Sequence, residues 1–254
     1  MAASDETDFR GKRLDDANFS GARLHSCSFV GTRVTDGFLL NADISGFIGG
    51  MRVNGVDVEP LVQAELDRQF PERVKLRATD PQGLRDAWGL IEEVWGRTVA
   101  RARRLPEPLL HERVDGEWSF VETLRHLVFA TDGWLFRMLQ GEPRPYHPWG
   151  LAGSFLTDPA SIGIEPDAHP SPDEVLAVRR ERMDAVRETI EGLTPEELER
   201  VCQPPDAEGH PAEAQSVLGC LHVILDEEWE HGRYANRDLA ILESRVEETK
   251  QAED

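Results

Sequence analysis

Large apolar residues recur every five residues at the start of the chain, a spacing that fits neither an α-helix nor a β-strand. The series is Phe9, Leu14, Phe19, Leu24, Phe29, Val34, Leu39 and Ile44. A small residue lies two positions before each of the last six: Ala17, Ala22, Cys27, Thr32, Gly37 and Ala42. Each unit can therefore turn one large and one small side chain to the same side. This predicts a repetitive coil, with Cys27 as a packing residue.

The repeat resembles the pentapeptide-repeat family over residues 8 to 47. In that family, four units form one coil of a right-handed β-helix, with the large and small residues inside. Thr7 and Lys12 depart from the small position in the first two units, which suits a capping end. Eight units make about two coils, whereas stacked repeats usually need three. The resemblance therefore implies a short N-terminal β-helix cap, residues 1–57, that packs on another part.

Charge and composition restrict the class of partner. The chain has 48 acidic and 28 basic residues, a net charge of -20, which repels nucleic-acid backbones and anionic membrane surfaces. Only -2 of that charge falls on residues 1–58, so the repeat is a poor DNA mimic and topoisomerase protection is disfavoured. No apolar run approaches 18 residues, and the three cysteines have no paired spacing. We expect a cytoplasmic protein with neither nucleic acid nor membrane as partner.

From Val58 onward the apolar period becomes 3.6, which predicts a mainly α bundle over residues 58–254. Start and stop signals divide it into four main helices, at about 81–104, 119–140, 171–192 and 213–243. Asp80 before Pro81 and the Ser119/Glu122 pair are typical helix starts. A Pro- and Gly-rich loop, residues 143–172, is long enough to be a lid or pocket wall. The pattern favours an up-and-down four-helix bundle.

One face of the last helix carries two groups that are costly in a core. Glu227 and His231 are four residues apart and share a side with Ile224, Ala235 and Leu242. A carboxylate and an imidazole there require pairing, protonation or a metal. Glu228 is a weaker alternative to Glu227, and His222 points to nearly the opposite side.

A third candidate ligand lies on the second main helix, where His126 follows Glu122 by one turn among apolar residues. His126, Glu227 and His231 would form a two-histidine, one-carboxylate set, suited to Zn, Ni, Mn or Fe(II) with positions left for water or substrate. The spacing also fits a plain alternative, namely a helix salt bridge and an unrelated core histidine.

The segments EWSFVETLRHLVFATDGW and SVLGCLHVILDEEWEHGRYANRDLAIL resemble the DinB-like superfamily of four-helix metalloproteins. The resemblance covers about Val58 to Leu242. It implies a metal triad of His126, Glu227 and His231, in the glutamate variant seen in mycothiol-dependent maleylpyruvate isomerases and related thiol S-transferases. It further implies transfer of mycothiol, bacillithiol or a similar thiol to an electrophile.

Other residues are weaker candidates for the site. His147 and Trp149 follow the second main helix and could wall a pocket, and Trp118 and Arg233 are candidates for substrate binding. The remaining histidines have no partner at ligand spacing and are expected at the surface: His25, His111, His169 and His210.

Three functions stay open. A metal lowers the pKa of what binds it, so a small thiol would become a nucleophile, whereas bound water would make a hydrolase. No serine or cysteine triad, P-loop or dinucleotide fingerprint competes. The nonenzymatic alternative is a stress-response or interaction module with a structural or vestigial metal. A homodimer is compatible with any of these.

Overall fold

The computed structural model describes residues 8–24 and 27–253. Backbone contacts divide the chain into two compact units, Met1–Ala42 and Asp43–Asp254. The sequence predicts a boundary after residue 57, whereas the first compact unit ends at Ala42, the last small residue of the repeat. Cys27 is exposed, and His25 lies outside the described residues.

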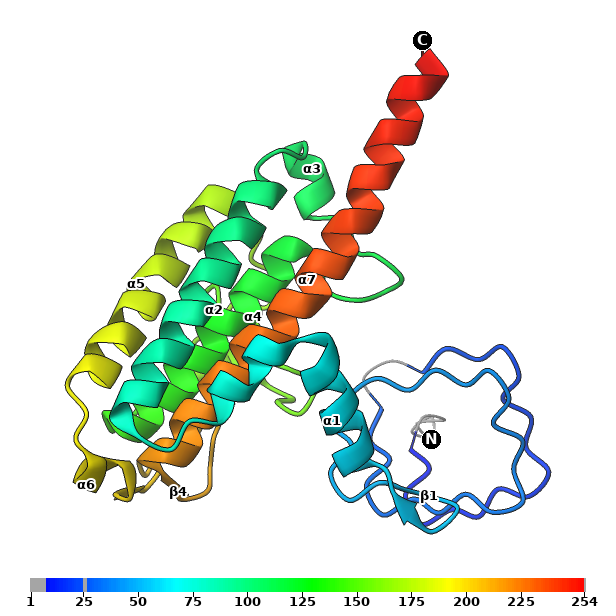
Figure 1. Cartoon of the computed structure of the whole chain (residues 1–254), viewed down its shortest axis with the longest axis horizontal. Coiled ribbons are helices and arrows are strands. Elements are labelled where there is room, and N and C mark those ends of the chain that lie inside the picture. Colours follow the sequence, from blue (N-terminus) through cyan, green and yellow to red (C-terminus); the bar gives the residue numbers. More distant parts are fainter. Residues whose placement is uncertain (1–7, 25–26, 254) are drawn as a thin grey trace. The chain divides into compact units, whose positions relative to one another are not determined.

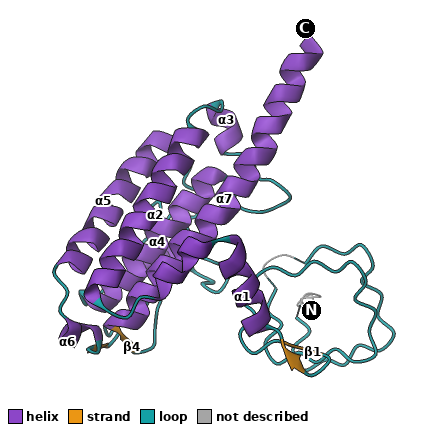
Figure 2. Cartoon of the chain, viewed as in Figure 1, coloured by secondary structure: helices purple, strands orange, loops and turns teal. Residues whose placement is uncertain are grey.

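The first unit keeps the five-residue period as repeated turns. Its described residues include no strand, and Figure 2 draws them as loop. The left-handed backbone positions fall five or ten residues apart: Gly11, Asp16, Gly21, Gly31, Asp36 and Asn41. Phe9 accepts a turn hydrogen bond from Lys12, and this bond recurs at ten-residue intervals at residues 19, 29 and 39.

The predicted β-helix is not seen in this unit. The large side chains of its five-residue series are 51% (Leu14) to 65% (Val34) exposed, so they do not fill an interior. A β-helix needs each coil to hydrogen-bond and stack on neighbours, and two coils provide few neighbours. The five-residue pattern therefore specifies the local turn but not a packed cap.

The second unit begins with a small antiparallel hairpin of β1 (Arg52–Val53) and β2 (Val56–Asp57). Asn54 and Gly55 both have positive φ, as a two-residue hairpin turn requires. Helix α1 (Glu59–Gln69) and the 3-10 helix η1 (Pro71–Arg77) lead from the hairpin into the bundle.

Four long helical segments make the bundle (Figure 1): α2 (Pro81–Ala102), α4 (Phe120–Thr131) with its continuation η2 (Asp132–Leu139), α5 (Pro172–Glu191) and α7 (Val217–Glu253). Helix α2 packs on α5 and α7, and α4 packs on the same two, so the four close around one core. The minor elements are α3 (Glu107–Leu110), η3 (Pro159–Ile162), α6 (Pro195–Leu198), β3 (Val201–Cys202) and β4 (Gln215–Ser216). The structure thus confirms a mainly helical fold.

Three predicted helix starts coincide with observed caps. Asp80 accepts hydrogen bonds from the backbone of Gln82 and Gly83 at the start of α2. Capping boxes open α4 at Ser119, α5 at Ser171 and α6 at Thr194. These side chains satisfy backbone N–H groups that a helix start leaves unpaired.

Two helices differ from the sequence prediction. Helix α7 begins at Val217 rather than near residue 213, because residues 215–216 pair with β3. It continues to Glu253, ten residues beyond the predicted end. From Asp132 the second helix continues as a π-helix, a form that apolar periodicity does not reveal and that often occurs at functional sites.

The bundle core is aliphatic and aromatic, with Trp88, Leu124, Leu127 and Leu221 at most 1% exposed. Several charged side chains are nevertheless buried in it: Arg125, Asp132, Arg137, Arg179 and Glu228. Buried charges are stable only when they are paired or hydrogen-bonded, so each of these side chains is expected to hold a partner in a fixed position. No helix among the described residues is long and apolar enough to cross a membrane.

Candidate metal centre

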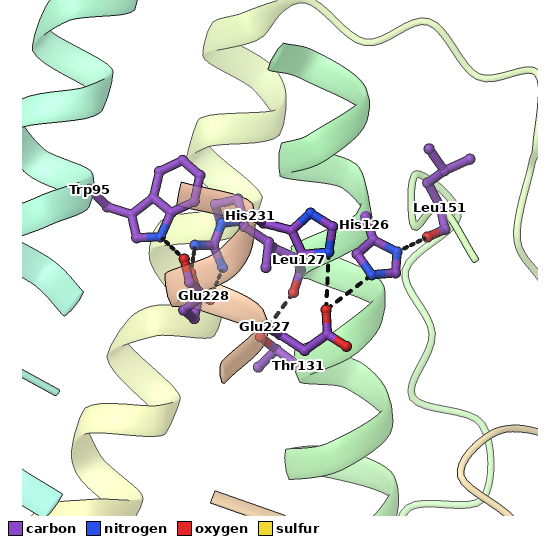
Figure 3. Close-up of polar contacts among 9 residues, drawn as sticks. Trp95, His126, Leu127, Thr131, Leu151, Glu227, Glu228 and His231 are labelled. Carbon is purple, nitrogen blue, oxygen red and sulfur yellow. Dashed lines mark hydrogen bonds and ion pairs between the residues drawn. The ribbon is translucent and has the colours of Figure 1, made fainter. Parts of the chain in front are cut away.

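The packed pair α4 and α7 brings three candidate ligands together (Figure 3). His126 comes from α4, and Glu227 and His231 come from successive turns of α7. One ligand atom of each lies within 4.8 Å of the others, and this is the one group of three or more His, Cys, Asp or Glu at such spacing in the described chain. The structure therefore brings together the predicted triad.

A single carboxylate oxygen lies between the two imidazoles. Glu227 Oε2 is 3.3 Å from Nε2 of His126 and 3.1 Å from Nε2 of His231. Donors about 2.0–2.2 Å from a tetrahedral zinc would lie roughly 3.4 Å apart, close to both separations. Both carboxylate–imidazole separations thus have the spacing expected of two ligands on one ion.

The hydrogen bond behind His126 decides which nitrogen faces the other ligands. Nδ1 lies 2.9 Å from the carbonyl oxygen of Leu151, in the loop after η2. Since a carbonyl can only accept, Nδ1 carries a hydrogen, and Nε2 is the nitrogen that faces Glu227. A proton or a cation between Nε2 and the carboxylate oxygen satisfies both atoms. A backbone carbonyl behind a ligating histidine is also a common second partner in metal sites.

Electrostatics keep Glu227 ionised. Burial raises the pKa of its carboxyl group, but the contacts with His126 and His231 outweigh burial, so the pKa lies well below its ordinary value. The carboxylate is therefore available as an anionic ligand at any physiological pH. The residues present fit a divalent cation in type, spacing and charge.

The cluster is accessible on one side. The His126 side chain is 8% exposed, whereas Glu227 and His231 are 31% and 20% exposed. Trp118, which directly precedes the cap of α4, lies over both imidazoles, with ring centres 4.5 Å from His126 and 5.8 Å from His231. Of the predicted substrate-binding residues, the structure brings Trp118 to the triad.

The other predicted pocket residues take different positions. The His147 backbone donates to Asp132, and the His147 ring meets Trp149 edge-on at 5.2 Å. Arg125 donates to the carbonyl of Trp149, two residues before the carbonyl that holds His126. Arg233 pairs with Glu230 and lies over the ring of Phe70, and neither of these contacts involves the triad.

His210 differs from the surface position expected from the sequence. Its backbone exchanges two hydrogen bonds with the hydroxyl of Tyr146, and its ring lies 4.5 Å from Phe155. Burial lowers the pKa of His210, and the charge of Glu227 acts in the opposite direction. Sequence spacing could not find this residue, because its neighbours lie more than fifty positions away. His111 and His169 are exposed, as expected.

The chain is thus a helical bundle in which two histidines and one carboxylate form a group that could hold a metal ion. The family model of the DinB superfamily matches residues 90–235, more than half of the chain, and the chain belongs to that superfamily. The match includes all three triad residues. No curated protein and no solved structure matches the chain significantly.

Proposed function

We propose that this protein binds a divalent metal at His126, Glu227 and His231 and activates a small thiol there for transfer to an electrophile. The observation that supports the metal is the cluster itself, in which Glu227 Oε2 lies 3.3 Å from His126 Nε2 and 3.1 Å from His231 Nε2. Zinc is the first candidate, with nickel, manganese and iron as others. A metal so placed supplies one thing: it lowers the pKa of a bound thiol so that thiolate forms near neutral pH.

The remaining steps depend on the chain's own residues. The Leu151 carbonyl fixes the tautomer of His126, and Glu227 contributes one negative charge. Three protein ligands leave room for an exogenous one. Trp118 provides an aromatic wall beside both histidines, suited to shield a thiolate and an apolar electrophile from water. His147 and Trp149 belong to the loop that holds His126, and Arg233 lies further off; substrate roles for these three are weaker proposals.

A second function rests on the first unit. Its seven large repeat side chains, from Phe9 to Leu39, are more than half exposed, and exposed apolar patches commonly mark interaction sites. In this alternative the protein is a nonenzymatic binding or stress-response module, or a homodimer, and its metal is structural. Residual exposure of Glu227 and His231 favours the thiol transferase over a sealed structural site.

The first experiment is elemental analysis of purified wild-type protein beside His126→Ala and His231→Ala, with His169→Ala as an exposed-histidine control. We expect near-stoichiometric metal in the wild type and the control and a loss in both triad variants. Absence of bound metal and of uptake from added Zn, Ni, Mn or Fe(II) would refute the proposal.

The thiol is tested separately on cobalt-loaded protein with 2-mercaptoethanol as probe. Binding of the thiolate to the metal should produce a sulfur-to-cobalt charge-transfer band that is absent without metal. A metal-loaded protein with no such band for this probe, cysteine or N-acetylcysteine would favour the structural metal instead.

A further inference from the structure

A buried ion pair includes Glu228, the residue of α7 that follows the candidate ligand Glu227. Arg179 on α5 donates from both terminal nitrogens to Glu228, at 2.8 and 2.7 Å, one bond to each carboxylate oxygen. The side chains are 3% and 1% exposed. Among the ion pairs of the described residues, this is the one in which both side chains are less than 5% exposed. The two parallel hydrogen bonds of the guanidinium fix the orientation of the Glu228 carboxylate as well as its distance from Arg179.

Helix α2 also contacts α7 at Glu228. Trp95 on α2 donates its indole N–H to the backbone carbonyl of Glu228 at 3.2 Å. The guanidinium of Arg179 lies 5.5 Å above the Trp95 ring. Residue 228 is therefore held by its side chain to α5 and by its backbone to α2, and Figure 3 shows Trp95 and Glu228 on the opposite side of α7 from Glu227.

Stability alone does not account for this pair. Removing two charges from water costs about as much as their attraction returns, and well-packed apolar residues often replace such pairs without loss. The pair does, however, fix the rotation of α7 about its own axis. Successive helix residues differ by about 100°, so the direction of Glu228 sets those of Glu227 and His231. A turn of α7 by one residue would direct Glu228 at His126 instead.

We propose that the Arg179–Glu228 pair, with Trp95, is a positioning device that fixes the rotation and height of α7 so that Glu227 and His231 meet His126 around a metal. This inference rests on the proposed metal site. It explains why Glu227, and not Glu228, is the ligand. Arg179, Glu228 and Trp95 act through the ligands and not on the substrate.

The decisive variant removes both charges together, Arg179→Met with Glu228→Met. The single variant Arg179→Met leaves a buried, unpaired carboxylate and is expected to be less stable, so it cannot separate the two roles. In the double variant we expect the urea midpoint to return to the wild-type value or above it. Zinc affinity, measured by competition with a chelator, should stay about 10- to 100-fold weaker, as for other residues that orient ligands.

Two comparisons sharpen the result. Arg101 and Glu243 also join α2 to α7, at 2.6 Å, but Glu243 lies twelve residues beyond His231. Arg101→Met with Glu243→Met should leave zinc affinity within about twofold. Arg179→Lys keeps the charge but not the fork, and should give an intermediate zinc affinity.

Recovery of zinc affinity together with stability in the Arg179/Glu228 double variant would overturn the positioning role, because the pair would then only balance charge. A wild-type protein that takes up no zinc would instead refute the metal site, and the positioning role with it. The two failures are therefore distinguishable.

Discussion

Gly133 illustrates how one residue allows two segments to meet. It lies at the start of the π-helix, and a Cβ atom there would fall 2.7 Å from the carbonyl oxygen of His210 and 3.3 Å from Pro211. Glycine is therefore required for the segment around His210 to lie against η2. That approach places His210 beside Phe155 and within reach of the charge of Glu227.

Gly133→Ala should lower the free energy of unfolding by about 1–3 kcal/mol, since backbone must move to admit the methyl group. Gly96→Ala is the matched control, because Gly96 is exposed on α2 and has open space around its Cβ position. The control should raise stability by about 0.5–1 kcal/mol. Urea unfolding measures both, and equal effects would contradict the close approach.

Asp132 predicts a specific pH dependence. Burial raises the pKa of its carboxyl to about 6 from 3.8, although Arg182 and the backbone N–H of His147 favour the ionised form. The folded state thus binds the proton more tightly than the unfolded chain. Protonated Asp132 stabilises the fold below about pH 4, and this contribution is lost as the pH rises through 6.

Asp132→Asn removes this titration. The difference in unfolding free energy between wild type and variant should therefore shift by about 3 kcal/mol, against the wild type, between pH 4 and pH 7. Urea unfolding at several pH values measures it. A difference that is constant with pH would show that Arg182 cancels the effect of burial.

At the scale of elements, the caps determine where the ligand-bearing helix begins. Ser119 is 3% exposed and caps α4 seven residues before His126, whereas the Ser171 cap of α5 is less buried. Loss of a capping hydroxyl typically costs about 1 kcal/mol. Ser119→Ala should cost more than Ser171→Ala, because water can replace the lost hydroxyl more easily at residue 171. Chemical unfolding of the two variants tests the order, and a larger loss for Ser171→Ala would contradict it.

The whole molecule should be stabilised by its metal. At a free zinc concentration 100 times the dissociation constant, linkage adds about 2.7 kcal/mol to stability. For a chain of this size that corresponds to a rise of about 5–10 °C in Tm. The rise should vanish with EDTA and in His126→Ala, and should shrink as the pH falls, because protons compete for the ligands. Calorimetry measures each case, and an equal rise in His126→Ala would indicate zinc bound elsewhere.

The two units should be separable. The buried hydrophobic core contains only residues from Leu76 onward among those described, whereas the large side chains of the first unit remain exposed. Residues 43–254 alone should retain helical circular dichroism, a cooperative transition and stoichiometric zinc. Residues 1–42 alone should give no cooperative transition. Loss of folding in the 43–254 fragment would show that the repeat stabilises the bundle.

Local signals predicted the helix starts at Asp80, Ser119 and Ser171, because a cap depends on residues within four positions. The face shared by Glu227 and His231 also follows from helical geometry within one segment. The joining of His126 to that face was proposed from its apolar surroundings and strengthened by resemblance to a family, since no spacing along the chain relates residues a hundred positions apart.

By itself, then, the sequence determined the change of period near residue 58, the helical class of the body and the identity of the candidate ligands. The tertiary structure alone decided that the repeat forms turns without a filled interior, that His210 is clamped by Tyr146, and that Glu228 pairs with Arg179. Periodicity and caps are local and can be read from neighbours. Burial and the rotation of α7 depend on contacts between distant helices.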